Sequence, residues 1–107
     1  MTTFDKREES FEKKFALDEE QKFKAEARRN RLLGLWVAEK LGLSGDAAND
    51  YAKMVVAAEF DQGGAAAVVR KVTGDLAAKG VAVTDAQLRM KMDELMALAA
   101  AQVKAGT

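Results

Sequence analysis

The chain has 107 residues, 49% of them apolar, with 17 acidic and 17 basic side chains and a pI of about 6.3. This length fits one domain with a modest core, and the zero net charge excludes the overall basic character of a typical nucleic-acid-binding domain. Cysteine and histidine are both absent, which excludes disulfides, Cys/His zinc sites and catalytic triads with an imidazole base.

Charged residues are densest near the N-terminus, where residues 4–15, FDKREESFEKKF, carry eight charges in twelve positions. On a helix, Phe4, Phe11 and Phe15 fall within an arc of roughly 40°, which is too narrow to pack into a core. We expect residues 1–17 to form an arm that is mobile or only partly helical in the free protein and that docks its phenylalanines into a partner's groove. A frayed terminus is the alternative, although exposed phenylalanines in register invite association.

The next segment predicts a long helix that ends before Gly42. Residues 16–31 consist of strong helix formers and extend the helix backward from Leu32, with Phe23 and Ala27 leading into the core line. From there the apolar residues recur at three- and four-residue spacing: Leu32, Leu33, Leu35, Trp36, Val37 and Leu41. Gly42 is placed where a left-handed C-terminal cap belongs.

Two further helices follow in the sequence. Ser44 is expected to cap the second helix, and Asp46 in its first turn suits the helix dipole. The apolar face of this helix is Ala48, Tyr51, Ala52, Val55, Val56 and Phe60. The apolar face of the third helix is Ala65, Val68, Val69, Val72 and Leu76. Gly74 within it costs roughly 1 kcal/mol relative to alanine, and Gly80 ends it.

The fourth helix has the clearest start signal. Thr84 and Gln87 form a T-x-x-Q capping box, and Val83 can pack on Leu88 as a hydrophobic staple. The apolar line is Leu88, Met92, Leu95, Met96, Ala99 and Val103. Four helices with short loops, and no sustained strand-like alternation, predict an all-α fold: a small antiparallel four-helix bundle over residues 18–107.

The sequence offers no catalytic residues and no metal site. Acidic pairs such as Glu8/Glu9 and Glu19/Glu20 lie in a strongly solvated segment, where burial cannot tune a general acid. Neither glycine-rich stretch supplies the lysine of a Walker-type phosphate loop. A signal-peptide core and an apolar run of roughly 18 residues are also absent. We therefore expect a cytoplasmic, non-enzymatic protein without direct membrane insertion.

A basic run between residues 22 and 31 is the main candidate binding feature of the bundle. Its cations oppose only Glu26: Lys22, Lys24, Arg28, Arg29 and Arg31. On a helix Lys24, Arg28 and Arg31 share one side, a spacing that can hold phosphate or meet an acidic protein surface. The alternative is a solvated face paired to neighbouring acids, such as Glu20 with Lys24. A small helical nucleic-acid-associated protein is a less favoured alternative, because the net charge is zero, and we expect no nucleic-acid partner.

Two blocks of the sequence are long enough to be distinctive: F-D-x-R-E near the start, and F-K-x-E-A-R-R-N-R-L-L-G-L-W-x-A-E-x-L-G over residues 23–42. Residues 4–45, which contain both blocks, resemble the zeta subunit of the F-type ATP synthase of alphaproteobacteria. The segments DYAKMVVAAEF and VVRKVTGDLAAKGVAVTDAQLRMKM continue the resemblance, so that it covers essentially the whole chain.

The resemblance implies a four-helix bundle whose N-terminal arm inhibits ATP hydrolysis by the catalytic head of the synthase. By analogy with the mitochondrial inhibitor protein, the arm wedges as a helix between alpha and beta subunits, close to the gamma stalk. The arm matches the family's run at Phe4, Asp5, Arg7, Glu8, Lys14 and Phe15. Phe11 belongs to the arm through the phenylalanine stripe. The protein is then peripheral to the inner membrane through the synthase, and we expect it to be a monomer when free.

The family is also associated with binding of ADP or ATP to the bundle. The resemblance gives no residues for the nucleotide, and charge alone makes Arg28, Arg29 and Arg31 candidates for contact with a nucleotide or a partner. Two regulatory interpretations stay open: an inhibitor that acts through the arm, or an adenine-nucleotide-binding module whose arm reports occupancy. No other cofactor is expected.

Overall fold

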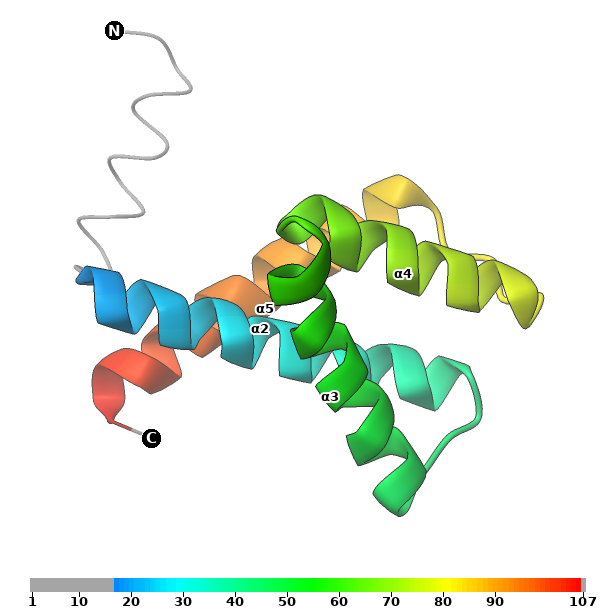
Figure 1. The fold of residues 1–107 in the computed structure, drawn as a ribbon, viewed down its shortest axis with the longest axis horizontal. Helices are drawn as coiled ribbons and strands as arrows, with labels where there is room; N and C mark the ends of the chain where they lie inside the picture. Colours follow the sequence, from blue (N-terminus) through cyan, green and yellow to red (C-terminus); the bar gives the residue numbers. More distant parts are fainter. Residues whose placement is uncertain (1–16, 107) are drawn as a thin grey trace, which may run out of the picture.

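The structure is a computed structural model that describes residues 17–106, apart from the side chain of Gln62 (Figure 1). Its helices are α2 (Glu19–Lys40), α3 (Gly45–Gln62), α4 (Ala65–Ala78) and α5 (Asp85–Ala105). No strand is present in the described part of the chain, so the predicted all-α four-helix fold is confirmed. Residues 1–16 lie outside the described residues, and the expected mobility of the arm stays a prediction.

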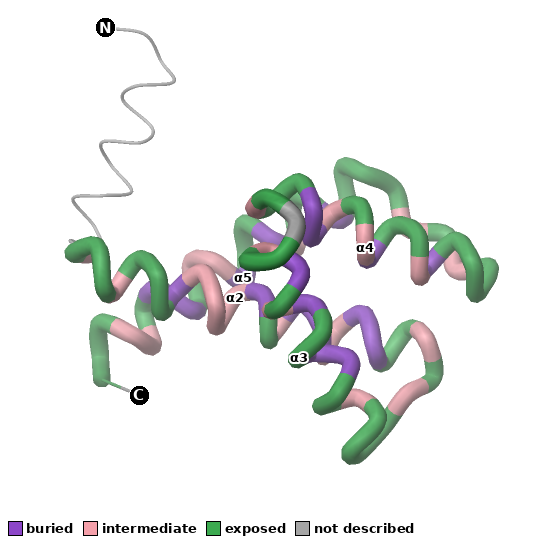
Figure 2. The backbone as a smooth tube through the Cα atoms, viewed as in Figure 1, coloured by how far each residue is buried: buried purple, intermediate pink, exposed green. Residues whose placement is uncertain are grey.

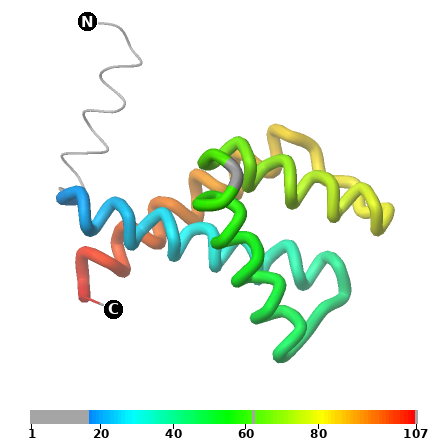
Figure 3. Tube along the Cα trace, viewed as in Figure 1, coloured from blue at the N-terminus to red at the C-terminus, as the bar shows by residue number. Residues whose placement is uncertain are grey.

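Helix α2 is the axis of the fold, because it contacts each of the other three helices. α5 runs antiparallel beside it, so that the start of α2 and the end of α5 lie at the same end of the molecule (Figures 1 and 3). α3 crosses α2, and α4 leads from there toward the other end (Figure 1). The start of α2 and the end of α5 form the end of the molecule that we call the two-helix end (Figure 1).

Two apolar clusters hold the helices together (Figure 2). The larger cluster takes buried side chains from all four helices: Leu33, Val37, Ala38, Tyr51, Val55, Val68, Val72, Leu76, Leu88, Met92 and Leu95. The smaller cluster joins α2 to α5 through Ala25, Ala99 and Ala100, with Leu17 packed against it. Alanines allow the two helix backbones to approach closely but bury little apolar area per residue. The two-helix end is thus the less strongly packed part of the fold.

Capping boxes begin two of the helices. At the start of α5 the amide of Gln87 donates to Thr84 Oγ1 at 3.1 Å, and the amide of Thr84 donates to Gln87 Oε1 at 3.0 Å, which confirms the predicted T-x-x-Q box. A second box was not predicted: the amide of Gln21 donates to Asp18 Oδ1 at 2.7 Å, and the amide of Asp18 donates to Gln21 Oε1 at 3.2 Å. Two orphan amides are satisfied at each start, so α2 begins sharply after Asp18.

The loop between α2 and α3 confirms one predicted cap and corrects another. Gly42 has a φ of +80°, and the amide of Leu43 donates to the carbonyl of Ala38 at 2.9 Å, which is the predicted left-handed C-terminal cap. Ser44 occupies the N-cap position of α3, but its side chain makes no capping hydrogen bond, so this predicted cap is wrong. Gly45 directly after it has a φ of +56°, and the first residue of the helix therefore lacks the helical geometry that aims a serine at the following amides.

Gly34 marks the closest approach of α2 to α3. A Cβ atom at this position would lie 2.6 Å from the Cα of Ala52 and 3.1 Å from its Cβ. A backbone atom at that distance cannot move aside without moving α3 itself. Glycine on one helix and alanine on the other therefore set how closely the two helices cross.

Phe23 and Phe60 are not core residues, contrary to the sequence prediction. Their side chains are 55% and 53% exposed, and their rings pack against each other with centroids 5.2 Å apart and planes inclined by 49°. Phe23 lies on the same face of α2 as Gly34 but three turns earlier, where α3 is already ending. The ring of Phe60, near the end of α3, covers part of it, so an aromatic pair remains on the surface.

A polar contact links α3 to α4. The hydroxyl of Tyr51 donates to Asp75 Oδ2 at 2.7 Å, and Lys71 Nζ lies 3.2 Å from the same oxygen. Burial raises the pKa of Tyr51 well above its usual value, and the hydrogen bond and charge of Asp75 raise it further. The phenol therefore stays neutral at physiological pH, and the contact stabilises the fold without offering an acid or a base.

The close crossing predicts opposite effects for two glycines. Gly34→Ala should destabilise the protein by about 1–3 kcal/mol, because the added methyl group forces α2 and α3 apart. Gly74→Ala is the matched control, since Gly74 lies within α4 with open space around its Cα, and it should stabilise by roughly 0.5–1 kcal/mol. Urea unfolding followed by circular dichroism measures both. Equal effects of the two changes would contradict the assigned crossing.

Candidate functional site

A groove of about 720 Å³ lies along the first half of α2, between α3 on one side and the end of α5 on the other. Its walls come from these three helices and from the cap residue that follows α5: Gln21, Phe23, Lys24, Ala27, Arg28, Arg31, Lys53, Val56, Val103 and Gly106. Four of these side chains are cations and none is an acid. We call this the basic groove.

Helical spacing explains how α2 brings three cations to the basic groove. Lys24, Arg28 and Arg31 are four and three residues apart, so they project from one side of the helix, as predicted. Lys53 joins them from α3 because it follows Ala52, which the Gly34 crossing holds against α2. The sequence did not reveal this fourth cation, since its position depends on how two helices pack.

The cations of the basic groove differ in how their charges are used. Lys24 pairs with Glu20 at 3.2 Å in an exposed i,i+4 ion pair, which confirms the predicted pairing and contributes little stability. Arg28 Nη1 donates to Gln102 Oε1 at 3.4 Å, which ties α2 to α5. Arg31 and Lys53 make no ion pair with any residue between 17 and 106. Their positive charges are the ones that an anion could meet directly.

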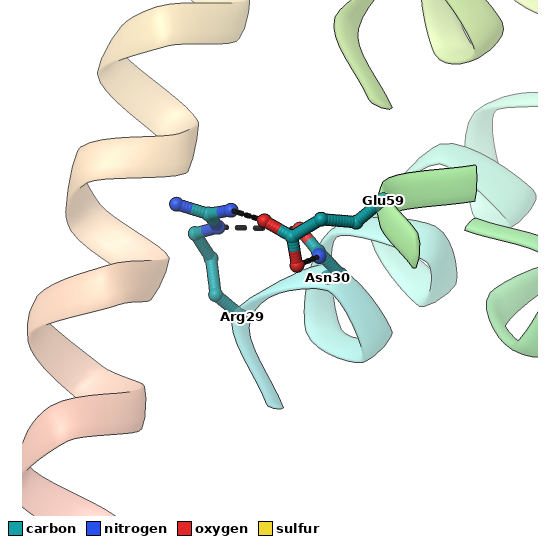
Figure 4. A network of polar contacts seen from close by, with 3 residues as sticks. All are labelled: Arg29, Asn30 and Glu59. Carbon is teal, nitrogen blue, oxygen red and sulfur yellow. Dashed lines mark hydrogen bonds and ion pairs between the residues drawn. The ribbon is translucent and has the colours of Figure 1, made fainter. Parts of the chain in front are cut away.

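Arg29 does not line the basic groove but belongs to a polar network between α2 and α3 (Figure 4). Its Nη2 lies 3.3 Å from Glu59 Oε1, with both side chains only 13% exposed. Asn30, which is fully buried, donates from Nδ2 to Glu59 Oε2 at 2.7 Å and accepts from Arg29 Nε at 3.2 Å. No buried side-chain nitrogen or oxygen among the described residues lacks a hydrogen-bond partner, as buried polar groups require. The structure therefore separates Arg29 from Arg28 and Arg31.

The arm residues lie outside the described part of the chain, and their predicted roles stay predictions: Phe4, Asp5, Arg7, Glu8, Phe11, Lys14 and Phe15. The first described residue is Leu17, which packs on the alanine cluster at the two-helix end. That end also carries part of the basic groove, through Gln21, Lys24 and Gly106. The arm thus joins the bundle beside the basic groove.

The basic groove offers groups that are suited to binding an anion. The basic groove presents ammonium and guanidinium groups, which donate hydrogen bonds to phosphate or carboxylate oxygens. Phe23 and Val56 add apolar surface beside them. Within residues 17–106 no group of three or more acidic side chains converges in a way that could hold a metal ion. None of the described helices has the length and apolarity needed to cross a membrane.

A comparison with known protein families shows to which family the chain belongs. The model of the family described as ATPase inhibitor subunit zeta matches residues 1–102. The chain belongs to this family. The match spans the arm, the basic run of α2 and nearly all of α5, which confirms the resemblance seen in the sequence and makes the protein an ATPase inhibitor subunit by family.

A solved structure supports the zeta fold independently. A protein determined by solution NMR is 54% identical to this chain, with a TM-score of 0.68, and the alignment covers 79% of this chain and 96% of that one. A search of curated proteins finds no significant match. At this identity the four-helix architecture of the zeta chain is shared with an experimental structure.

The separation of the arginines predicts that Arg29 and Arg31 differ in their effect on stability. Arg29→Gln should lower the free energy of unfolding by roughly 1–3 kcal/mol, because it leaves the largely covered Glu59 carboxylate short of a charged partner. Arg31→Gln is the matched control and should stay within about 0.5 kcal/mol of the wild type. Chemical denaturation measures both changes. A destabilising Arg31→Gln with a neutral Arg29→Gln would reverse the assignment.

Proposed function

We propose that the protein is a regulatory, non-catalytic subunit that suppresses ATP hydrolysis by the catalytic head of the F-type ATP synthase, acting through its N-terminal arm. The observation that carries the proposal is that the family match begins at residue 1 and so includes the arm as well as the bundle. The partners of the arm are the alpha and beta subunits at a catalytic interface, near gamma. The protein then works in the cytoplasm, at the periphery of the inner membrane.

The contacts at the start of α2 support separate roles for the arm, which binds the partner, and the bundle, which keeps its own fold. The Asp18–Gln21 capping box starts α2 at a fixed point, and Leu17 packs against the alanine cluster. These contacts among residues 17–21 and the alanine cluster stabilise the start of the bundle. The arm can therefore bind a partner while the bundle keeps its fold.

Energetics limit what the phenylalanines can do alone. Ordering about 15 residues costs on the order of 1–2 kcal/mol each in backbone entropy. Burial of Phe4, Phe11 and Phe15 returns about 1.5–3 kcal/mol apiece, which is well short of that total. Charge pairs from the arm, backbone hydrogen bonds and residual helicity must supply the rest, or a second contact must come from the bundle.

Deletion of residues 1–15 should abolish inhibition without unfolding the protein, because the capping box and Leu17 are retained. An ATPase assay on the cognate catalytic head, with and without the protein, measures inhibition, and thermal circular dichroism checks the fold. A truncated chain that still inhibits fully would refute the arm mechanism.

Within the arm, Phe4→Ala and Phe15→Ala should each weaken inhibition by roughly tenfold or more, the amount expected for an apolar anchor of this size. Phe11→Ala tests whether the regular phenylalanine stripe is required, because Phe11 is not among the positions matched to the family's run. The ATPase titration gives the concentration for half-maximal inhibition of each variant. Unchanged inhibition by both Phe4→Ala and Phe15→Ala would remove the anchors from the mechanism.

The basic groove favours a second function, which is binding of an adenine nucleotide such as ADP or ATP. Four cations and no acid around a groove of this size suit a polyphosphate, and the exposed ring of Phe23 offers a face on which a base can stack. Arg28 and Arg31 keep the contact role that the sequence suggested for them, with Lys53 added. Nucleotide binding and inhibition are compatible, since the groove is built from residues between Gln21 and Gly106 and the inhibitory contacts are proposed for the arm.

Titration with ADP should give saturable amide shifts in residues that line the basic groove. Arg31→Gln and Lys53→Gln should each weaken binding by roughly tenfold, because each removes a charge-assisted contact. Arg70→Gln is the control, since Arg70 is an exposed cation on α4 outside the groove. The absence of a saturable shift would rule out the ligand. Retained ADP affinity after deletion of the arm would separate this function from inhibition.

A further inference from the structure

We propose that a second surface of the bundle docks an acidic helix with an apolar anchor on the same catalytic head that the arm engages. This surface, the Trp36 platform, consists of Trp36 and Lys40 on α2, Val83 in the loop before α5, and Met90 and Lys91 on α5. They line a groove of about 460 Å³. The choice of partner rests on the proposed function, whereas the surface itself does not.

Two ammonium groups converge on the indole of the platform. Lys40 Nζ lies 4.8 Å from the centroid of the Trp36 ring, and Lys91 Nζ lies 5.5 Å from it. Lys91 is also held by Glu94 at 3.4 Å, whereas Lys40 makes no ion pair with any residue in the described range. Cation–π contacts hold the two charges close to the ring. The platform therefore presents positive charge at the rim of an aromatic surface.

The apolar part of the platform is exposed to solvent to a degree that packing of the core does not explain. Met90 is 72% exposed, more than any other large apolar side chain described in the structure. Trp36 is partly buried against the large cluster, so packing at the edge of the core accounts for its position. Packing does not account for the exposure of Met90 or for the two lysines beside the indole. Tryptophan is enriched among residues that dominate binding energy, and methionine adapts to partner surfaces.

Charge selects the kind of partner. Two lysines against one acid leave the platform positive in a chain whose net charge is zero, so a partner with carboxylates around an apolar side chain complements it. A helix with acids one turn apart on either side of that anchor would set them over both lysines. Two cations are too few for stable attachment to an anionic membrane, which takes larger basic clusters.

Placement on the fold makes the platform useful to an arm that binds weakly. Trp36 lies 18 positions after Asp18 on one continuous helix, about 27 Å along it at 1.5 Å per residue. A contact there holds the arm near its own site at a high effective concentration, so that two weak contacts act as one strong one. The platform thus supplies the second contact that the arm's energetics call for.

The test uses the full chain with two double variants of matched chemistry. The platform variant combines Lys40→Glu with Met90→Ser. The control combines Lys79→Glu with Met54→Ser, because these two residues line a different groove near α4 and Met54 is 52% exposed. The purified catalytic head is the probe, and binding is read by biolayer interferometry, with the ATPase assay run separately.

We expect the platform variant to bind the head roughly tenfold more weakly than the wild type, and the control to stay within about twofold of the wild-type affinity. Both variants should inhibit fully at saturation, because their arm is intact. Labelling with 5-fluorotryptophan gives one ¹⁹F resonance, because Trp36 is the single tryptophan. It should shift or broaden when the head is added to the wild type, and thermal melts verify that both variants fold.

Equal affinities of the three proteins, or an unperturbed ¹⁹F resonance in the bound state, would overturn the platform. Two other results would also overturn the proposal, because each assigns the surface to another occupant. One is self-association that is lost only in the platform variant, and the other is binding to vesicles with about 30% anionic lipid that is lost only in the platform variant. The proposed function fails by a different result, in which wild-type protein saturates the head without inhibiting hydrolysis. Absence of any binding by the wild type would refute both.

Discussion

The crossing of α2 and α3 at Gly34 is the constraint on which the rest of the bundle depends. With no room for a methyl group between Gly34 and Ala52, the two helices meet backbone to backbone, and the register of one on the other is set there. Two consequences follow along α3. Lys53 is brought to the rim of the basic groove, and two turns later Glu59 reaches Asn30 and Arg29. One close contact therefore positions both a polar network and a binding surface.

The arginines of α2 show how one helix serves packing and binding at once. Arg28 and Arg29 are neighbours in sequence but project about 100° apart, which sends one toward the basic groove and the other toward α3. A guanidinium paired with a buried carboxylate is weak support for stability in itself, although loss of one partner is strongly unfavourable. The network around Glu59 is therefore better understood as fixing which face of α2 receives α3, a hypothesis that a double-mutant cycle of Arg29 and Glu59 can test.

The sequence predicted the helices well because their signals are local. The Thr84–Gln87 box, the left-handed Gly42 and the apolar spacing of each helix depend only on neighbouring residues, and all three appear in the structure. The Asp18–Gln21 box was equally local, and D-x-x-Q before a run of helix formers was the signal that would have found it. Residues 18–107 as one unit, and residues 1–17 as an arm, remain predictions.

Tertiary features were predicted less well, for a physical reason. Periodicity gave Phe23 and Phe60 to core faces, but it cannot say how much of each face a neighbouring helix covers, and both side chains are more than half exposed. The basic groove was half predicted: α2 spacing placed Lys24, Arg28 and Arg31 together, while Lys53 and Val56 required the α2–α3 crossing. Separation of Arg29 from the other two depended on Glu59, 30 positions away in the chain.

Helix α2 connects the three surfaces to which we assign the proposed contacts. It is continuous from Glu19 to Lys40, with the arm joined at its start, the basic groove along its first half and the Trp36 platform near its end. A continuous helix does not bend easily, so the distance between the start of α2 and the platform stays nearly constant. Two-point attachment gains affinity only if that distance matches the partner. A rigid α2 therefore makes the proposed attachment selective for one spacing, which a flexible linker of the same length would not do.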